Sequence, residues 1–162
     1  MGLCHSQSDF ANAEYGRSAL RSLCVENGID STTIFFCKQE RILESIRDHY
    51  CQVYLYNDLG FLIEPLIKDK LVELAQLEFV FKNLHKIKPH HCDSSKSLEL
   101  EKENWVIGKD FSLQNSFVIV CYWSVRKHIQ EQLLRMHELI KIKSRFADIP
   151  IRLVFVNQDF IP

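Results

Sequence analysis

The sequence predicts an α/β fold, and three segments near its C-terminus carry the prediction. Residues Phe117 to Trp123 form a continuous apolar run of the length typical of a buried strand. Residues Arg126 to Arg145 place apolar side chains at helical spacing, which indicates an amphipathic helix. A second apolar run, Ile151 to Val156, follows the connection at Asp148 to Pro150. These segments predict a strand–helix–strand unit with the spacing of an α/β nucleotide-binding core.

Length and composition restrict the possible function classes. The chain has 162 residues, enough for one domain with a buried core. It carries 20 basic and 21 acidic side chains, so no basic excess indicates a nucleic-acid partner. The apolar runs are too short to span a bilayer, and the first residues lack the pattern of a secretory signal. We therefore expect free thiols at all cysteines, which are Cys4, Cys24, Cys37, Cys51, Cys92 and Cys121.

The first six residues fit a lipidation motif. Gly2 and Ser6 match the pattern M-G-x-x-x-[ST] of N-myristoylation, and Cys4 offers a position for S-acylation. One myristoyl chain binds a membrane only marginally, whereas two acyl chains anchor a protein stably. We expect a membrane anchor at Gly2 and Cys4, and the alternative is an unmodified start with a free cysteine.

The first half of the chain shows mixed patterns. Asp9 to Asn27 has helical spacing, and Gly28 is a plausible stop. Ser31 to Phe36 fits a strand by its β-branched and aromatic content, or a helix entry. Lys38 to Tyr50 predicts a helix, and Cys51 to Phe61 fits either a short helix or a strand.

The pattern changes after Leu71. Between Leu77 and Lys82 apolar and charged or smaller residues alternate, which predicts a half-buried strand. Leu84 to Lys88 would then form the second strand of a hairpin, with Asn83 near its turn. The polar stretch from Pro89 to Asn104 predicts a loop with a short helix.

Several segments resemble the guanine-nucleotide-binding α subunits of heterotrimeric G proteins. Ala19 to Ile29 resembles a helix of that family's all-helical domain, and Tyr54 to Leu59 resembles its Y-Y-L-x-D-L motif. Leu77 to His85 is similar to the family's H-F-x-F-K-[DN]-L-H-F-K. Phe117 to Asn157, which contains Arg135-Met-His-Glu138, is similar to its strand–helix–strand block. The segments occur in the family's order and cover most of the chain.

The resemblance implies a truncated, divergent member with a partial Ras-like sheet and a remnant of the all-helical domain. On this interpretation residues 1–8 are a lipidation segment, 9–70 the helical-domain remnant and 71–162 a partial Ras-like GTPase domain. The family implies GTP or GDP with Mg²⁺, receptor and βγ partners, and a place at the cytoplasmic face of the plasma membrane. No nucleic-acid partner is implied.

The sequence lacks the motifs with which the family binds and hydrolyses its nucleotide. The phosphate loop G-x-x-x-x-G-K-[ST], the R-x-x-T of switch I and the D-x-G-G-Q of switch II have no counterpart in the sequence. Of the base-recognition motif N-K-x-D, Asn157 keeps its place, Gln158 replaces the Lys, and Asp159 sits one residue early. Asn157 and Asp159 are thus the candidate nucleotide contacts. We assign no catalytic residue and no metal ligand, we expect no cofactor, and whether the chain is an enzyme stays open.

The missing first strand of a Ras-like sheet has a structural consequence. That strand would lie between the segments Leu84 to Lys88 and Phe117 to Trp123, so its loss leaves central backbone groups unpaired. We expect either that the remaining strands pair with one another or that this part is incompletely ordered.

One further group of residues combines metal-ligand types. His85, His90, His91 and Cys92 could together bind Zn²⁺, but the second pair of ligands typical of structural zinc is missing, so a solvated loop is the favoured interpretation. Cys92 as a nucleophile lacks an orienting motif.

The resemblance predicts a G-protein α-like signal transducer in receptor signalling that has lost GTP binding and hydrolysis. The alternatives are a membrane-tethered interaction module without nucleotide, and the product of a decayed gene.

Overall fold

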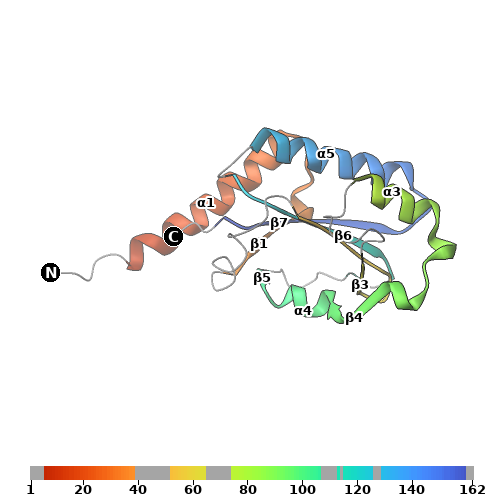
Figure 1. Cartoon of the computed structure of the whole chain (residues 1–162). Coiled ribbons are helices and arrows are strands. Elements are labelled where there is room, and N and C mark those ends of the chain that lie inside the picture. Colours follow the sequence, from red (N-terminus) through yellow and green to blue (C-terminus); the bar gives the residue numbers. More distant parts are fainter. Residues whose placement is uncertain are drawn as a thin grey trace.

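The fold is a mixed α/β structure built on one sheet. The computed structural model describes residues 6–38, 52–64, 74–106, 113, 115–125 and 129–159, with side chains described from residue 16 onward. The described strands form a seven-stranded sheet in the order β4-β3-β2-β6-β7-β1-β5. Helices α1, α3 and α5 lie on one side of it, and α4 lies on the other (Figure 1). The predicted α/β class is confirmed.

The centre of the sheet is the predicted strand–helix–strand unit. Strand β6 (Phe117–Trp123) runs parallel to β7 (Ile151–Asn157), in register from Phe117 opposite Ile151 to Trp123 opposite Asn157. Helix α5 (Ile129–Arg145) connects the two strands. Strand β1 (Ile34–Cys37) continues the sheet, parallel to β7. The structure confirms all three predicted C-terminal elements. They could be predicted because their apolar patterns are long enough to be unambiguous.

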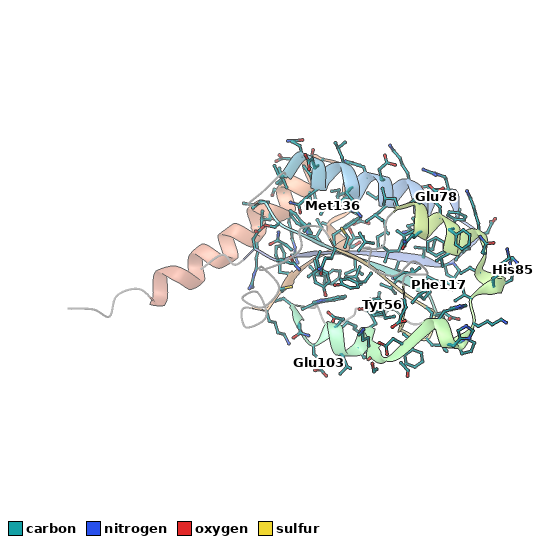
Figure 2. All side chains as sticks on the ribbon, viewed as in Figure 1. Tyr56, Glu78, His85, Glu103, Phe117 and Met136 are labelled. Atoms are coloured by element: carbon teal, nitrogen blue, oxygen red, sulfur yellow. The ribbon has the colours of Figure 1, made fainter. Side chains whose placement is uncertain are left out.

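Alternation along the central strands divides the core between the two faces of the sheet. On β6, Ile119, Cys121 and Trp123 join the apolar cluster on the helix side. Val118, Val120 and Tyr122 join the cluster on the opposite side. Figure 2 shows Met136 of α5 on one side of the sheet and Tyr56 on the other. The residues with which α5 packs onto the helix side are Leu133, Met136, Leu139 and Ile142, one face at helical spacing.

The N-terminal helix is also confirmed. Helix α1 (Ser6–Glu26) is followed two residues later by Gly28, whose φ of 74° is the left-handed conformation that glycine adopts without strain. The N–H of Ile29 donates to the carbonyl of Cys24 at 2.9 Å and closes the helix end. A 3-10 turn, η1 (Ser31–Thr33), leads into β1, so the ambiguous segment from Ser31 to Phe36 is a turn followed by a strand.

The described part of residues 9–70 is not an all-helical remnant, and the expectation of one is corrected. Besides β1, it contributes the antiparallel hairpin of β2 (Val53–Tyr56) and β3 (Phe61–Ile63) to the same sheet as β6 and β7. Strand β2 pairs antiparallel with β6 and buries Val53 and Leu55, which explains why this apolar and aromatic segment is extended. Strand β2 thus lies beside β6, where the G-protein resemblance implied that a strand of the sheet is missing. The predicted helix Lys38 to Tyr50 lies outside the described residues, apart from Lys38.

The predicted hairpin of Leu77 to Lys82 and Leu84 to Lys88 is wrong. Helix α3 (Leu74–Lys82) and the 3-10 turn η3 (Leu84–Lys86) occupy this region. Leu77, Val80 and Phe81 are buried at helical spacing, while Phe79 is 52% exposed. The helical period therefore outweighs the apparent alternation, and the segment does not form the strand that the G-protein resemblance implies.

The polar segment after α3 is more structured than predicted. After the turn η4 (Pro89–His91), β4 (Cys92–Ser97) pairs antiparallel with β3 at one edge of the sheet. The short helix α4 (Leu98–Lys102) confirms the predicted helix, and β5 (Trp105–Val106) pairs antiparallel with β1 at the other edge. Residues 92–106, which we call the strap, thus run from one sheet edge to the other and pack Leu98 and Trp105 onto the face opposite α5.

Candidate functional site

The two predicted nucleotide contacts lie together at the carboxyl end of β7. Asn157 is 1% exposed and Asp159 is 9% exposed. The amide nitrogen of the Asn157 side chain donates to Oδ2 of Asp159 at 2.9 Å, and the Asp159 backbone N–H donates to Oδ1 of Asn157 at 2.9 Å. Each of these side chains is therefore a hydrogen-bond partner of the other residue.

The start of the loop after β6 completes this group. The Val125 N–H donates to Oδ2 of Asp159 at 2.6 Å, and the Ser124 hydroxyl donates to Oδ1. The buried side chain of Gln132 accepts from the Ser124 N–H at 2.7 Å and donates to the Ser124 carbonyl at 2.5 Å. We call these residues, Ser124, Val125, Gln132, Asn157 and Asp159, the carboxyl-end cluster.

The carboxyl-end cluster joins the ends of two parallel strands and the first turn of α5. In open α/β sheets ligands bind at this edge. Here the carboxyl group of Asp159 is directed at donors of its own chain, and so is the side-chain carbonyl of Asn157. Buried networks of this kind rigidify a fold when their groups are satisfied. Among the described residues, the geometry is that of a structural network.

The remaining predicted positions are placed elsewhere or not described. Gly2 and Cys4 lie outside the described residues. The His90 and His91 rings lie 4.1 Å apart between centroids, and Nδ1 of His91 accepts from the Lys88 N–H at 3.0 Å. Across the described part of the chain, no three His, Cys, Asp or Glu side chains are placed to hold a metal ion.

Cys92 does not have the surroundings of an activated thiol. Its sulfur accepts from the side-chain amide of Asn57 at 3.4 Å. Burial, followed by the nearby charge of Asp58, raises the pKa of Cys92, and the Asn57 hydrogen bond opposes them only in part. A raised pKa lowers the thiolate fraction, which is the opposite of what a nucleophile requires.

The structure also contains a pocket that the sequence did not reveal. A cavity of about 550 Å³ lies between the sheet and the strap. Its lining comes from the sheet and from the strap, and consists of Cys37, Gln52, Tyr54, Tyr56, Leu62, Ser95, Lys96, Ser97, Leu100, Glu101, Asn104, Tyr122 and Gln158. The pocket lies on the face opposite α5, because Tyr54, Tyr56 and Tyr122 belong to the core on that side.

Hydrogen bonds hold the polar side chains of the pocket in place. The Tyr122 hydroxyl donates to Oε2 of Glu101 at 2.7 Å and accepts from Nε1 of Trp105 at 3.2 Å. Burial and then the charge of Glu101 raise the pKa of Tyr122 well above its ordinary value, so the phenol keeps its proton. The Tyr54 hydroxyl donates to Gln52 at 2.6 Å, and the rings of Tyr54 and Tyr122 meet edge to face at 5.8 Å.

Only part of this pocket had a signal in the sequence. The alternation of Gln52, Tyr54 and Tyr56 places all three on one face once the segment is a strand. Glu101 comes from a short helix more than forty positions later, and no periodicity connects it to the tyrosines.

Comparisons of the chain with protein families, with characterised proteins and with solved structures found no match. Among the described helices, none combines the length and the apolar character that crossing a bilayer requires.

Proposed function

We propose that this chain is a membrane-tethered interaction module that holds no guanine nucleotide. The observation that supports it best is the carboxyl-end cluster, where Asn157 and Asp159 hydrogen-bond to each other and to the loop after β6. The sequence also contains no phosphate loop. Binding of GTP would need a phosphate cradle, a Mg²⁺ ligand and a free base-recognition side chain.

The nucleotide part of the proposal is tested by titrating purified protein with a fluorescent GTP analogue in the presence of Mg²⁺. We expect no saturable binding at micromolar protein. A dissociation constant in the micromolar range or below would contradict the proposal.

The tether is tested separately by cell fractionation. Gly2 and Cys4 together should hold the protein at the cytoplasmic face of the plasma membrane, since two acyl chains anchor stably and one does not. With a C-terminal tag that leaves Gly2 free, Gly2→Ala should release the protein completely and Cys4→Ser should give a mixed distribution. A wild-type protein found wholly in the soluble fraction would remove the tether from the proposal.

A G-protein α-like transducer is the second candidate, and one observation favours it. The parallel β6-α5-β7 unit has the connectivity expected for the family's block at Phe117 to Asn157. The helix at Leu74–Lys82 and the strands at 34–63 do not follow the family's pattern. Stoichiometric co-purification of G-protein βγ subunits with this chain would favour the transducer, and we expect none.

The decayed-gene alternative predicts that no stable structure forms. A cooperative thermal or urea melt of the purified chain without nucleotide excludes it, and we expect such a melt.

A further inference from the structure

The lining of the pocket between the sheet and the strap includes a buried amide side chain without a hydrogen-bond partner. Gln158 lines the pocket and is 8% exposed. Its backbone N–H donates to the Trp123 carbonyl at 2.8 Å. Its side-chain amide, by contrast, makes no hydrogen bond within the part of the chain that the structure describes. Buried amide groups are normally hydrogen-bonded, so this one calls for a partner from outside the chain.

Strand geometry places the Gln158 amide on the side of the sheet that holds the pocket. Val156 belongs to the apolar cluster on the face opposite α5. Side chains two positions apart along an extended chain lie on the same face of the sheet. The hydrogen bond from Gln158 to Trp123 continues the pairing of β7 with β6 past Asn157. The Gln158 side chain therefore lies on the same face as that of Val156, toward the pocket.

Two other amide side chains of the lining have unused hydrogen-bonding groups. Oε1 of Gln52 accepts from the Tyr54 hydroxyl at 2.6 Å, and its Nε2 has no partner among the described residues. Nδ2 of Asn104 donates to the carbonyls of Leu100 and Glu101 at 3.1 and 3.4 Å, and its Oδ1 likewise has no partner in the described chain. The lining therefore offers a further N–H donor and a further carbonyl acceptor.

The charged side chains of the described lining already have partners. Lys96 has a side chain that is 62% exposed, and it pairs with Asp93 at 3.2 Å. Glu101 accepts from the Tyr122 hydroxyl at 2.7 Å. These groups do not select an ion, so the lining favours a neutral ligand. The volume of about 550 Å³ lies within the range of roughly 300–1,000 Å³ that small-molecule pockets occupy.

We propose that this pocket binds a small neutral molecule with a lactam or carboxamide group, whose adjacent N–H and C=O pair with the side-chain amide of Gln158. An amide side chain has a donor and an acceptor next to each other, and it binds a matching edge through two parallel hydrogen bonds. The ligand is uncharged, so a nucleoside triphosphate does not fit this description. The inference goes beyond the proposed function, which stands whether or not a lactam binds.

The first experiment compares two ligands on the full-length wild-type protein. 2-Pyridone and N-methyl-2-pyridone are titrated while backbone amide NMR signals are recorded. We expect 2-pyridone to shift the signals of Leu62, Leu100 and Gln158 with a dissociation constant of about 1 mM, typical of so small a ligand. N-methyl-2-pyridone should bind about tenfold more weakly, because its blocked nitrogen leaves the buried Gln158 carbonyl unpaired.

The second experiment removes the amide from the pocket. Gln158→Met keeps the length of the side chain and lacks both hydrogen-bonding groups, so it should weaken 2-pyridone about tenfold and change the affinity for N-methyl-2-pyridone by less than about threefold. The matched control is Gln130→Met, because Gln130 is exposed on α5 and does not line the pocket. It should leave the affinities for both ligands within about twofold of wild type.

A stability measurement distinguishes a ligand contact from a structural role. The Gln158 amide makes no hydrogen bond within the described chain, so Gln158→Met should leave the midpoint of urea unfolding unchanged or raise it. A lowered midpoint relative to Gln130→Met would mean that the amide serves the fold, and it would overturn the inference.

Three further outcomes would contradict the proposal. They are the absence of a saturable shift with 2-pyridone, which would mean that water alone fills the pocket, equal affinity of the wild-type protein for the two pyridones, and equal affinity of the Gln158 and Gln130 variants for 2-pyridone. The ligand comparison on the wild-type protein needs no variant, so it decides the matter even if Gln158→Met fails to fold.

Discussion

The carboxyl-end cluster and the pocket lie side by side on the same two strands, yet their polar groups are used differently. At the end of β6 the chain passes from Tyr122 at the pocket to Ser124 in the cluster, and at the end of β7 it passes from Asn157 in the cluster to Gln158 at the pocket. In both regions the polar side chains bond to their own chain, and those of the pocket also surround a cavity. Polar residues at the ends of parallel strands therefore do not by themselves identify a binding site. Four experiments test this division.

The largest effect is expected in the cluster. Asp159→Asn replaces an acceptor with a donor where Ser124, Val125 and Asn157 all donate. We expect the free energy of unfolding to fall by about 2–4 kcal/mol, because buried donors are left without acceptors. Urea denaturation measures the change. The control Asp148→Asn is exposed and should stay within about 0.5 kcal/mol of wild type. Equal effects of the two variants would mean that the cluster does not hold the fold.

Gln132 gives a smaller effect within the same cluster. Gln132→Ala removes both hydrogen bonds to the Ser124 backbone and should lower the free energy of unfolding by about 1–2 kcal/mol. The exposed neighbour Gln130 provides the matched control, and Gln130→Ala should be close to neutral. A neutral Gln132→Ala would show that water replaces the side chain at Ser124.

Tyr122 allows a test by pH on the pocket side. In the unfolded chain a tyrosine ionises near pH 10, whereas the raised pKa of Tyr122 keeps the folded state protonated. Above that pH the unfolded state binds fewer protons than the folded state, so stability falls as pH rises. Tyr122→Phe should cost about 1 kcal/mol at pH 7 and should reduce this alkaline loss by about 1.4 kcal/mol per pH unit above 10. Urea melts at several pH values compare the two proteins, and parallel slopes would contradict the expectation.

The reactivity of two thiols distinguishes the pocket from the core, and this measurement needs no substitution that would change stability. Cys24 is fully buried, and burial raises its pKa to about 11, whereas Cys37 lines the pocket. Methyl methanethiosulfonate should modify Cys37 faster than Cys24 by about tenfold, as measured by peptide mass spectrometry. Equal rates at Cys24 and Cys37 would mean that the pocket does not admit small molecules.

The sequence predicted the fold best where only one secondary-structure pattern fitted a segment. The apolar runs of β6 and β7 and the amphipathic face of α5 were sufficient to predict the central unit. Between Leu77 and Phe81 two periods fit the same residues, and only burial of Val80 against the core decides for the helix. Strand β4 is polar apart from Cys92, so its own pattern does not predict a strand, and its pairing with β3 depends on a partner far away in sequence.

The candidate site was predicted only in part, for a related reason. The position of Asn157 and Asp159 after the last predicted strand marked them as candidates, and the two side chains do form a hydrogen bond. The hydrogen bonds of Asp159 to Ser124 and Val125 could not be predicted, because they depend on how the end of β6 packs beside the end of β7. The pocket depends on the placement of α4 over β2 and β6, which no local pattern specifies.

The path of the strap has a further consequence, for contacts between molecules. Its first strand, β4, pairs with β3 and its last strand, β5, pairs with β1, so this one segment supplies both edge strands of the described sheet. Uncovered strand borders offer rows of unpaired N–H and C=O groups that pair with other chains. Any ligand or modification that pulls the strap away from the sheet would therefore expose the edges of β3 and β1 at once, and we expect such a change to promote pairing between molecules.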